Sequence, residues 1–71
     1  MSMDADAVAR MNVTVEAFAQ RCLASKKPPF VALRECIAEL QALPYWSENE
    51  INRVEEAATR LINDRLASSG G

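Results

Sequence analysis

Histidine is absent from this chain of 71 residues, and cysteine, glycine and aromatic residues are scarce. Without histidine, the side chain that most often acts as a general base near neutral pH is missing. The two cysteines, Cys22 and Cys36, are too few for a structural zinc site built from cysteine and histidine. We therefore expect no catalytic site, no metal site and no cofactor.

Glycine occurs only at Gly70 and Gly71, so the chain has no glycine-rich loop that could hold a phosphate group. The carboxylates of Glu35 and Glu39 stand one helical turn apart, which is the spacing of a shared helix face. A paired-carboxylate site needs burial to shift a pKa, and a chain this small offers no deep cleft. We interpret both as solvent-exposed, and we predict that the protein is not an enzyme.

Long apolar runs are lacking as well, since none approaches the roughly 20 residues of a membrane span. The opening residues 1–6 are acidic where a secretory signal would be basic, so we expect no signal peptide. Cys22 and Cys36 form no Cys-x-x-Cys motif and fall on apolar helix faces, which favours buried thiols in a reducing compartment. These features predict a cytoplasmic protein without a membrane segment.

The net charge is -2, so the chain lacks the strongly basic character of nucleic-acid-binding domains. Charge is nevertheless uneven along the chain. One stretch without acids holds the cations Arg21, Lys26, Lys27 and Arg34, and a later stretch holds the acids Glu48, Glu50, Glu55 and Glu56. These groups either complement the dipoles of helix ends or form a polarised surface that orients a partner.

What the chain does contain is helical periodicity. The first apolar stripe, at spacings of three and four residues, consists of Val8, Met11, Val15, Phe18 and Cys22. Two lysines and then Pro28 and Pro29 follow it, which predicts a helix over 4–25. The β-branched run 13–15 leaves an alternative, a loose arm followed by a helix from about Thr14.

A second helix is predicted over 29–43, because proline is tolerated in a first helical turn and Pro44 ends the segment. Its stripe consists of Phe30, Leu33, Ile37 and Leu40, broadened by Val31, Cys36 and Leu43. A third helix is predicted over 48–66, with 67–71 as a flexible tail. Its stripe consists of Ile51, Val54, Ala58 and Leu61, followed by Ile62 and Leu66.

The start of the third helix carries the clearest local signal. Ser47 and Glu50 have the spacing of a capping box, and Trp46 and Ile51 have the spacing of a hydrophobic staple. Short connections make sequential helices antiparallel neighbours. We therefore predict one all-α domain over 1–66, either an up-down-up three-helix bundle or a helical hairpin plus a third helix. Because the helices are unequal, the first stripe could also overhang and complete the fold as a homodimer.

Tyr45 and Trp46 are adjacent aromatic residues in the loop before the third helix, and such residues often anchor protein interfaces. The prediction we favour, however, places both in the core, with Trp46 on Ile51 and Tyr45 at the end of the core. Together with Arg21 and Arg34 they are our candidate partner-binding residues. The sequence predicts a small non-enzymatic interaction module, a bacterial or phage-like regulator, inhibitor or adaptor that binds a larger protein.

Two other functions remain open. The second and third helices resemble a helix-turn-helix, which would make the protein a nucleic-acid-associated regulator. The acidic start at Glu48 and Glu50 would repel phosphate and disfavours this alternative. The protein could also be a structural small subunit of a larger complex.

Overall fold

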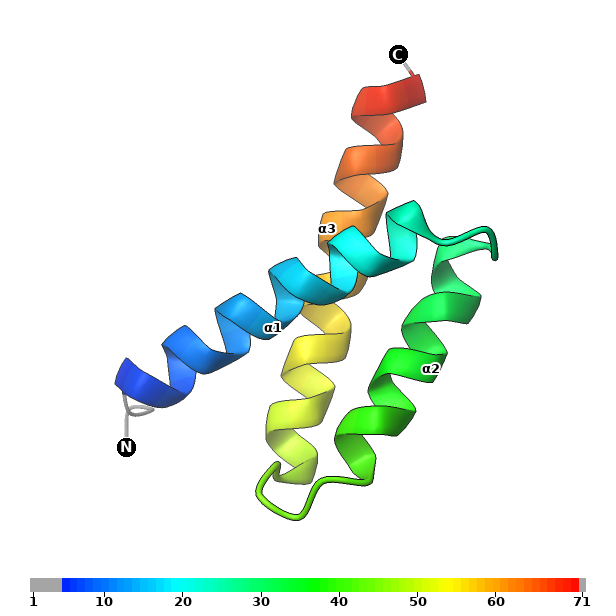
Figure 1. The fold of residues 1–71 in the computed structure, drawn as a ribbon. Coiled ribbons are helices and arrows are strands. Elements are labelled where there is room, and N and C mark those ends of the chain that lie inside the picture. The colour runs from blue at the N-terminus through cyan, green and yellow to red at the C-terminus, as the bar shows by residue number, and fades with distance from the viewer. Residues whose placement is uncertain (1–4, 71) are drawn as a thin grey trace.

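A computed structural model of the chain describes the backbone of residues 5–70 and the side chains of residues 5–68. It contains three helices, α1 (Ala5–Ala24), α2 (Pro29–Gln41) and α3 (Glu48–Gly70) (Figure 1). No strand is present between residues 5 and 70. The predicted all-α class and the order of three helices are therefore confirmed.

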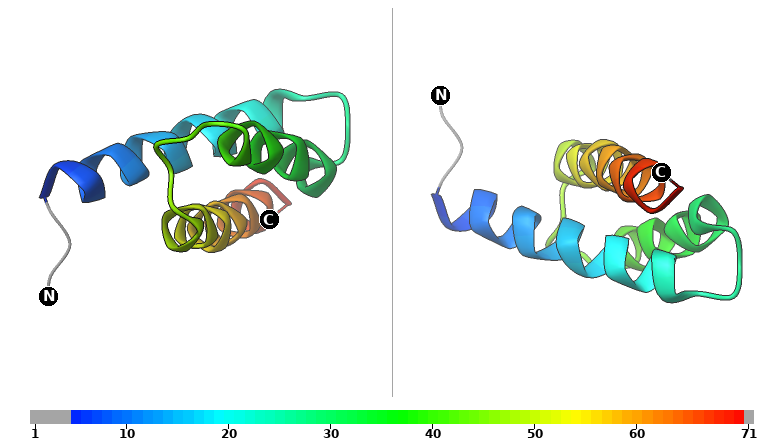
Figure 2. Two further views of the ribbon diagram at one scale, coloured as in Figure 1. Left: turned by 90° about the horizontal axis from the view of Figure 1, so that it is seen from below. Right: turned by 90° about the horizontal axis from the view of Figure 1, so that it is seen from above.

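The three helices all contact one another but are not parallel rods. Helices α2 and α3 lie side by side in opposite directions, while α1 crosses α3 obliquely (Figure 1). Seen from above and below, α3 covers one side of the layer formed by α1 and α2 (Figure 2). The result is a flat molecule with extents of 40 × 23 × 14 Å.

The core is made of apolar side chains from all three helices and from the loop before α3. Its members are Met11, Phe18, Ala19, Cys22, Ala32, Leu33, Cys36, Ile37, Leu40, Trp46, Ile51, Val54, Ala58 and Ile62. The largest fully buried side chains are Ile62, Val54 and Cys22, two of which lie on α3. No polar or charged residue is buried between residues 5 and 68, so the core carries no unpaired polar group that would cost stability.

Helix α1 runs without interruption through the β-branched segment 13–15, which confirms the single-helix prediction and not the alternative start near Thr14. The hydroxyl of Thr14 donates a hydrogen bond to the carbonyl oxygen of Arg10 at 2.8 Å. This bond gives a mid-helix threonine a partner inside its own helix. The helix ends at Ala24, one residue before the predicted end, and its predicted start at Asp4 lies outside the described residues.

The capping box at the start of α3 is also confirmed. The backbone N–H of Ser47 donates to Oε1 of Glu50 at 3.0 Å, and the N–H of Glu50 donates to Oγ of Ser47 at 3.2 Å. Two N–H groups at the helix start are thereby satisfied without water. Trp46 and Ile51, the predicted staple, are both buried members of the core.

The predicted stripes differ from the observed core at their ends. Their exposed members are Val8, Phe30, Val31, Leu43 and Leu66. Because α1 crosses α3 obliquely, the start of α1 and the end of α3 extend beyond their neighbours, which leaves Val8 and Leu66 uncovered (Figure 1). Two small residues that the stripes omitted, Ala19 and Ala32, are buried instead, and small side chains let helices approach closely.

Two helix ends also differ from the prediction. Helix α2 ends at Gln41 and not at Leu43, because the N–H of Ala42 and that of Leu43 bond back in a turn that precedes Pro44. Helix α3 continues to Gly70, where a tail was predicted from residue 67. No proline follows Leu66, and alanine favours helix continuation, so nothing local ends α3 there.

Candidate functional site

A groove of about 390 Å³ opens between the middle of α1, the end of α2 and the loop that follows. The lining comes from Arg10, Val13, Thr14, Ala17, Phe18, Glu39, Leu40, Leu43, Tyr45 and Trp46. We call it the Tyr45 groove. Its lining is more apolar than that of two other hollows on this surface, and it contains both predicted site residues of the loop, Tyr45 and Trp46.

The groove has a buried apolar floor and an exposed apolar rim. Phe18, Leu40 and Trp46 form the floor, and each is less than a tenth exposed. On the rim, Val13 is 69% exposed and Tyr45 is 63% exposed. Scattered apolar residues on a protein surface are ordinary, whereas apolar residues that gather around one hollow are typical of a binding site.

The local sequence explains why one aromatic residue forms the floor and the other the rim. The chain turns at Pro44, after which Trp46 occupies the position just before the capping residue of α3 and packs inward. Tyr45 precedes it in the turn and points away from the core, as its exposure shows. On α1, Val13 and Ala17 stand one turn apart and form a second apolar line beside the buried stripe.

A charged side chain stands at one end of the groove and is held by partners within the molecule. Nη2 of Arg10 lies 2.9 Å from Oε2 of Glu50, and its guanidinium lies 4.7 Å from the centre of the Trp46 ring. Hydrogen bonds from the backbone and side chain of Ser47, together with Arg10, lower the pKa of Glu50. Arg10 therefore joins α1 to the start of α3 and covers one face of the groove floor.

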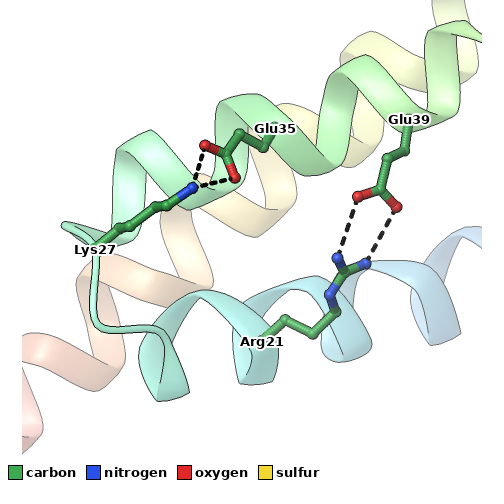
Figure 3. Close-up of polar contacts among 4 residues, drawn as sticks. All are labelled: Arg21, Lys27, Glu35 and Glu39. Carbon is green, nitrogen blue, oxygen red and sulfur yellow. Dashed lines mark hydrogen bonds and ion pairs between the residues drawn. The ribbon is translucent and has the colours of Figure 1, made fainter.

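A carboxylate at another part of the rim is paired in the same way. Both oxygens of Glu39 accept hydrogen bonds from Arg21, at 3.2 and 3.4 Å (Figure 3). This pairing is the main cause of the raised pKa of Arg21. Since Arg10 and Glu39 both have intramolecular partners, the free contact surface of the groove is mainly apolar.

The structure brings together some of the predicted partner-binding residues and not others. Trp46 forms the floor of the groove, Tyr45 its rim, and Arg21 adjoins it through Glu39. Arg34 is exposed on α2 and does not line the groove. The favoured prediction that Tyr45 closes the end of the core is wrong, because Tyr45 is exposed.

Two cations of the basic stretch, Arg21 and Lys27, pair with carboxylates of α2 and not with the acidic start of α3. Lys27 pairs with Glu35 at 2.7 Å, in the same region where Arg21 pairs with Glu39 (Figure 3). The carboxylates of Glu35 and Glu39 are therefore exposed, as predicted, but each is held in an ion pair. Ion pairs between side chains as exposed as these contribute at most about 1 kcal/mol each to the free energy of unfolding.

Most residues of the first apolar stripe, which was predicted to lie in the core or in a dimer contact, pack in the core of the single chain. Met11, Phe18 and Cys22 are buried, Val15 packs against the core, and only Val8 is exposed. Sequence reasoning missed Val13, Ala17 and Leu43 as groove residues. The available signal was the second apolar line at 13 and 17, but nothing local placed it opposite the loop at residue 43.

Between residues 5 and 70, no group of three or more His, Cys, Asp or Glu side chains is arranged to hold a metal ion. None of the helices in that range combines the length and the apolar character that crossing a membrane requires. No protein-family model, curated protein or solved structure matches the chain.

Proposed function

We propose that this protein is a cytoplasmic protein–protein interaction module, a regulator or adaptor without catalytic activity, that binds its partner through the Tyr45 groove. One observation supports this most directly. Val13, Leu43 and Tyr45 stand exposed on two different elements around a single apolar hollow. Burying these apolar side chains against a partner would remove their surface from water and so stabilise the complex.

The chemistry of the groove indicates what the partner contributes. An aromatic or aliphatic side chain would enter the hollow and contact the floor at Phe18 and Leu40, while Tyr45 packs beside it. The rim charges Arg10 and Glu39 already have partners, so recognition does not depend on a strongly charged ligand. We infer an amphipathic helix or loop of another protein as the bound element.

A nucleic-acid partner has less support. Four of the eight basic residues, Arg10, Arg21, Lys27 and Arg65, are engaged in ion pairs with carboxylates of the same chain. Helix α3, which would be the recognition helix of a helix-turn-helix, begins with Glu48. Both features oppose contact with phosphate.

The proposal is tested by site-specific photo-crosslinking in the native cells. Tyr45 is replaced by a photo-reactive phenylalanine derivative, and the matched control places the same residue at Val31, which is 48% exposed on α2 outside the groove. We expect one stoichiometric protein adduct from position 45 and none of that identity from position 31. Adducts that are the same at both positions, or nucleic-acid adducts from position 45, would contradict the proposal.

A second variant separates a regulator from a subunit of a larger assembly. Tyr45→Ala should abolish the adduct formed from a photo-reactive residue at Val13 and leave the helical circular dichroism signal unchanged. If several different proteins crosslink from Val13 and survive Tyr45→Ala, the protein is a structural subunit and the groove is not its main contact.

A further inference from the structure

The two cysteines form a pair that the proposed function does not use. Cys22 lies on α1 and Cys36 on α2, both are free thiols, and they are 0% and 3% exposed. The two helices contact each other, and because a short turn joins them, α2 runs back roughly opposite to the direction of α1 (Figure 1). No other thiol exists in the chain.

The register of α1 against α2 places these thiols opposite each other. Phe18 and Leu40 line the same groove, and Arg21 bonds to Glu39 across the same pair of helices (Figure 3). Cys22 stands one turn after Phe18, and Cys36 stands one turn before Leu40. In an antiparallel pair, one turn forward on one helix and one turn back on the other reach the same layer.

The raised pKa of the Cys22 thiol agrees with this register. Burial, followed by the neighbouring thiol of Cys36, raises the pKa of Cys22 to about 11. The charge of Arg21 also interacts with both thiols, so all three groups lie in one small region between α1 and α2.

We propose that Cys22 and Cys36 form an intramolecular disulfide that links α1 to α2 when the folded chain meets a low-molecular-weight disulfide such as oxidised glutathione. The Cys36 thiol loses its proton and attacks one sulfur of the oxidant, which releases one glutathione thiol and leaves a mixed disulfide. Cys22 then loses its proton and attacks the Cys36 sulfur, which releases the second glutathione thiol. Two protein thiols are oxidised by two electrons, and one oxidant disulfide is reduced to two thiols.

The order of these steps follows from how accessible each thiol is to the oxidant. Cys36 lines an opening of about 360 Å³ beside Arg21, Ser25 and Glu35, whereas Cys22 does not line it. Burial also raises the pKa of Cys22 to about 11, which lowers its thiolate fraction at neutral pH still further and makes it a poor first nucleophile. It reacts once the mixed disulfide on Cys36 is held next to it.

The crosslink would bear on the Tyr45 groove without depending on what the groove binds. The layer next to the two thiols contains Phe18 and Leu40, which form part of the groove floor. A covalent link one turn away fixes the separation of α1 and α2 at that floor. The closed loop spans residues 22–36 and contains the turn between the helices.

The test uses the purified chain of 71 residues, incubated with oxidised glutathione under native conditions. We expect a monomer that has lost two hydrogen atoms by intact mass, a crosslinked peptide that contains both cysteines, and a midpoint of thermal unfolding raised by roughly 10 °C or more. Addition of a dithiol reductant should reverse all three changes.

Two single variants provide the matched controls. Cys22→Ala should stop at one glutathione adduct on Cys36, and Cys36→Ala should leave Cys22 unmodified for as long as the chain stays folded. Crosslinking that occurs only in denaturant, a disulfide-linked dimer, or separate glutathione adducts on both cysteines of the wild-type chain would each overturn the proposal. The wild-type measurement decides the matter even if a variant fails to fold.

Discussion

At the scale of single residues, Tyr45 and Trp46 show how neighbours in sequence acquire opposite roles. Both are amphipathic aromatics in one loop, and the sequence predicts either a core or an interface position for each. Trp46 is 8% exposed, and Tyr45 is 63% exposed. The capping position of Ser47 directs Trp46 toward Ile51, while no such local constraint acts on Tyr45.

Truncating the two side chains should therefore have very different effects. We predict that Trp46→Ala lowers the free energy of unfolding by about 3–5 kcal/mol, because it removes a core aromatic and the surface that Arg10 covers. Tyr45→Ala should change it by less than about 0.5 kcal/mol. Urea unfolding followed by circular dichroism measures both changes. Equal losses in the free energy of unfolding would contradict the placement of Trp46 in the core and of Tyr45 at the surface.

The Cys22 thiol predicts a change of stability at high pH. Its pKa in the folded chain is raised from 9.0 to about 11, so the folded state holds a proton that the unfolded chain loses first. The free energy of unfolding should therefore fall as pH rises from about 9 to about 11. Cys22→Ala should remove this part of the decline, and the difference between the two pH profiles isolates it from the titration of other groups. Identical profiles would show that the thiol is not shielded.

At the scale of secondary structure, local signals were reliable where they concern backbone hydrogen bonds. The capping box at Ser47 and Glu50 formed as predicted, and α1 passed through its β-branched segment as one helix. The turn that ends at Pro28 separates α1 from α2 where expected. The end of α3, which has no such signal, lies at Gly70 and not at the predicted Leu66.

The capping box should account for a measurable part of the stability. Ser47→Ala removes the oxygen that accepts from the N–H of Glu50, so we predict a loss of about 1 kcal/mol in the free energy of unfolding. Ser47→Asp keeps an acceptor at the same position and should retain most of the stability. The measurement is urea unfolding of the three proteins in one buffer, and a loss as large with Asp as with Ala would argue against the cap.

Glu50 links this helix start to pH. Its pKa lies below the ordinary value of 4.5, because Ser47 and Arg10 favour the ionised carboxylate. The stabilisation is therefore complete above about pH 4.5 and is lost as pH falls through the lower folded-state pKa. Glu50→Gln keeps a capping oxygen but cannot titrate, so its stability should vary less with pH in this acid range. Thermal unfolding of both proteins between neutral and acid pH provides the comparison.

At the scale of the whole molecule, oblique packing decides which apolar side chains remain outside. The flat arrangement buries the middle of each helix and leaves Val8 near one end of α1 exposed. Three of the four ion pairs found among the side chains of residues 5–68, including Arg10 with Glu50 and Arg65 with Glu16, join α1 to another helix. Each of these pairs has at least one side chain that is more than 40% exposed, so the pairs orient α1 more than they stabilise it.

A homodimer stays a prediction at this scale, and its contact would use the exposed start of α1. Light scattering on a sizing column should then give twice the monomer mass of 7.8 kDa at high protein concentration. Val8→Asp should shift the mass toward the monomer, because a buried charge opposes association, while Val31→Asp at a similarly exposed site should not. A monomer mass at every concentration would exclude the dimer.

The sequence by itself determined that the chain is helical and how many helices form. It also determined that the third helix begins at the capping box and that prolines separate the helices. These features depend on residues within one or two turns of each other, so the pattern of apolar, capping and proline residues is sufficient. Only the tertiary structure decided that Val8 lies beyond the core and that Arg10 reaches Glu50 from forty residues away. The crossing of α1 over α3 sets both, and the Tyr45 groove forms where the packing of α1 against α2 brings Val13 and Leu43 to one hollow. Helix crossing depends on how side chains from distant segments fit together, and no periodicity within a single helix encodes that fit.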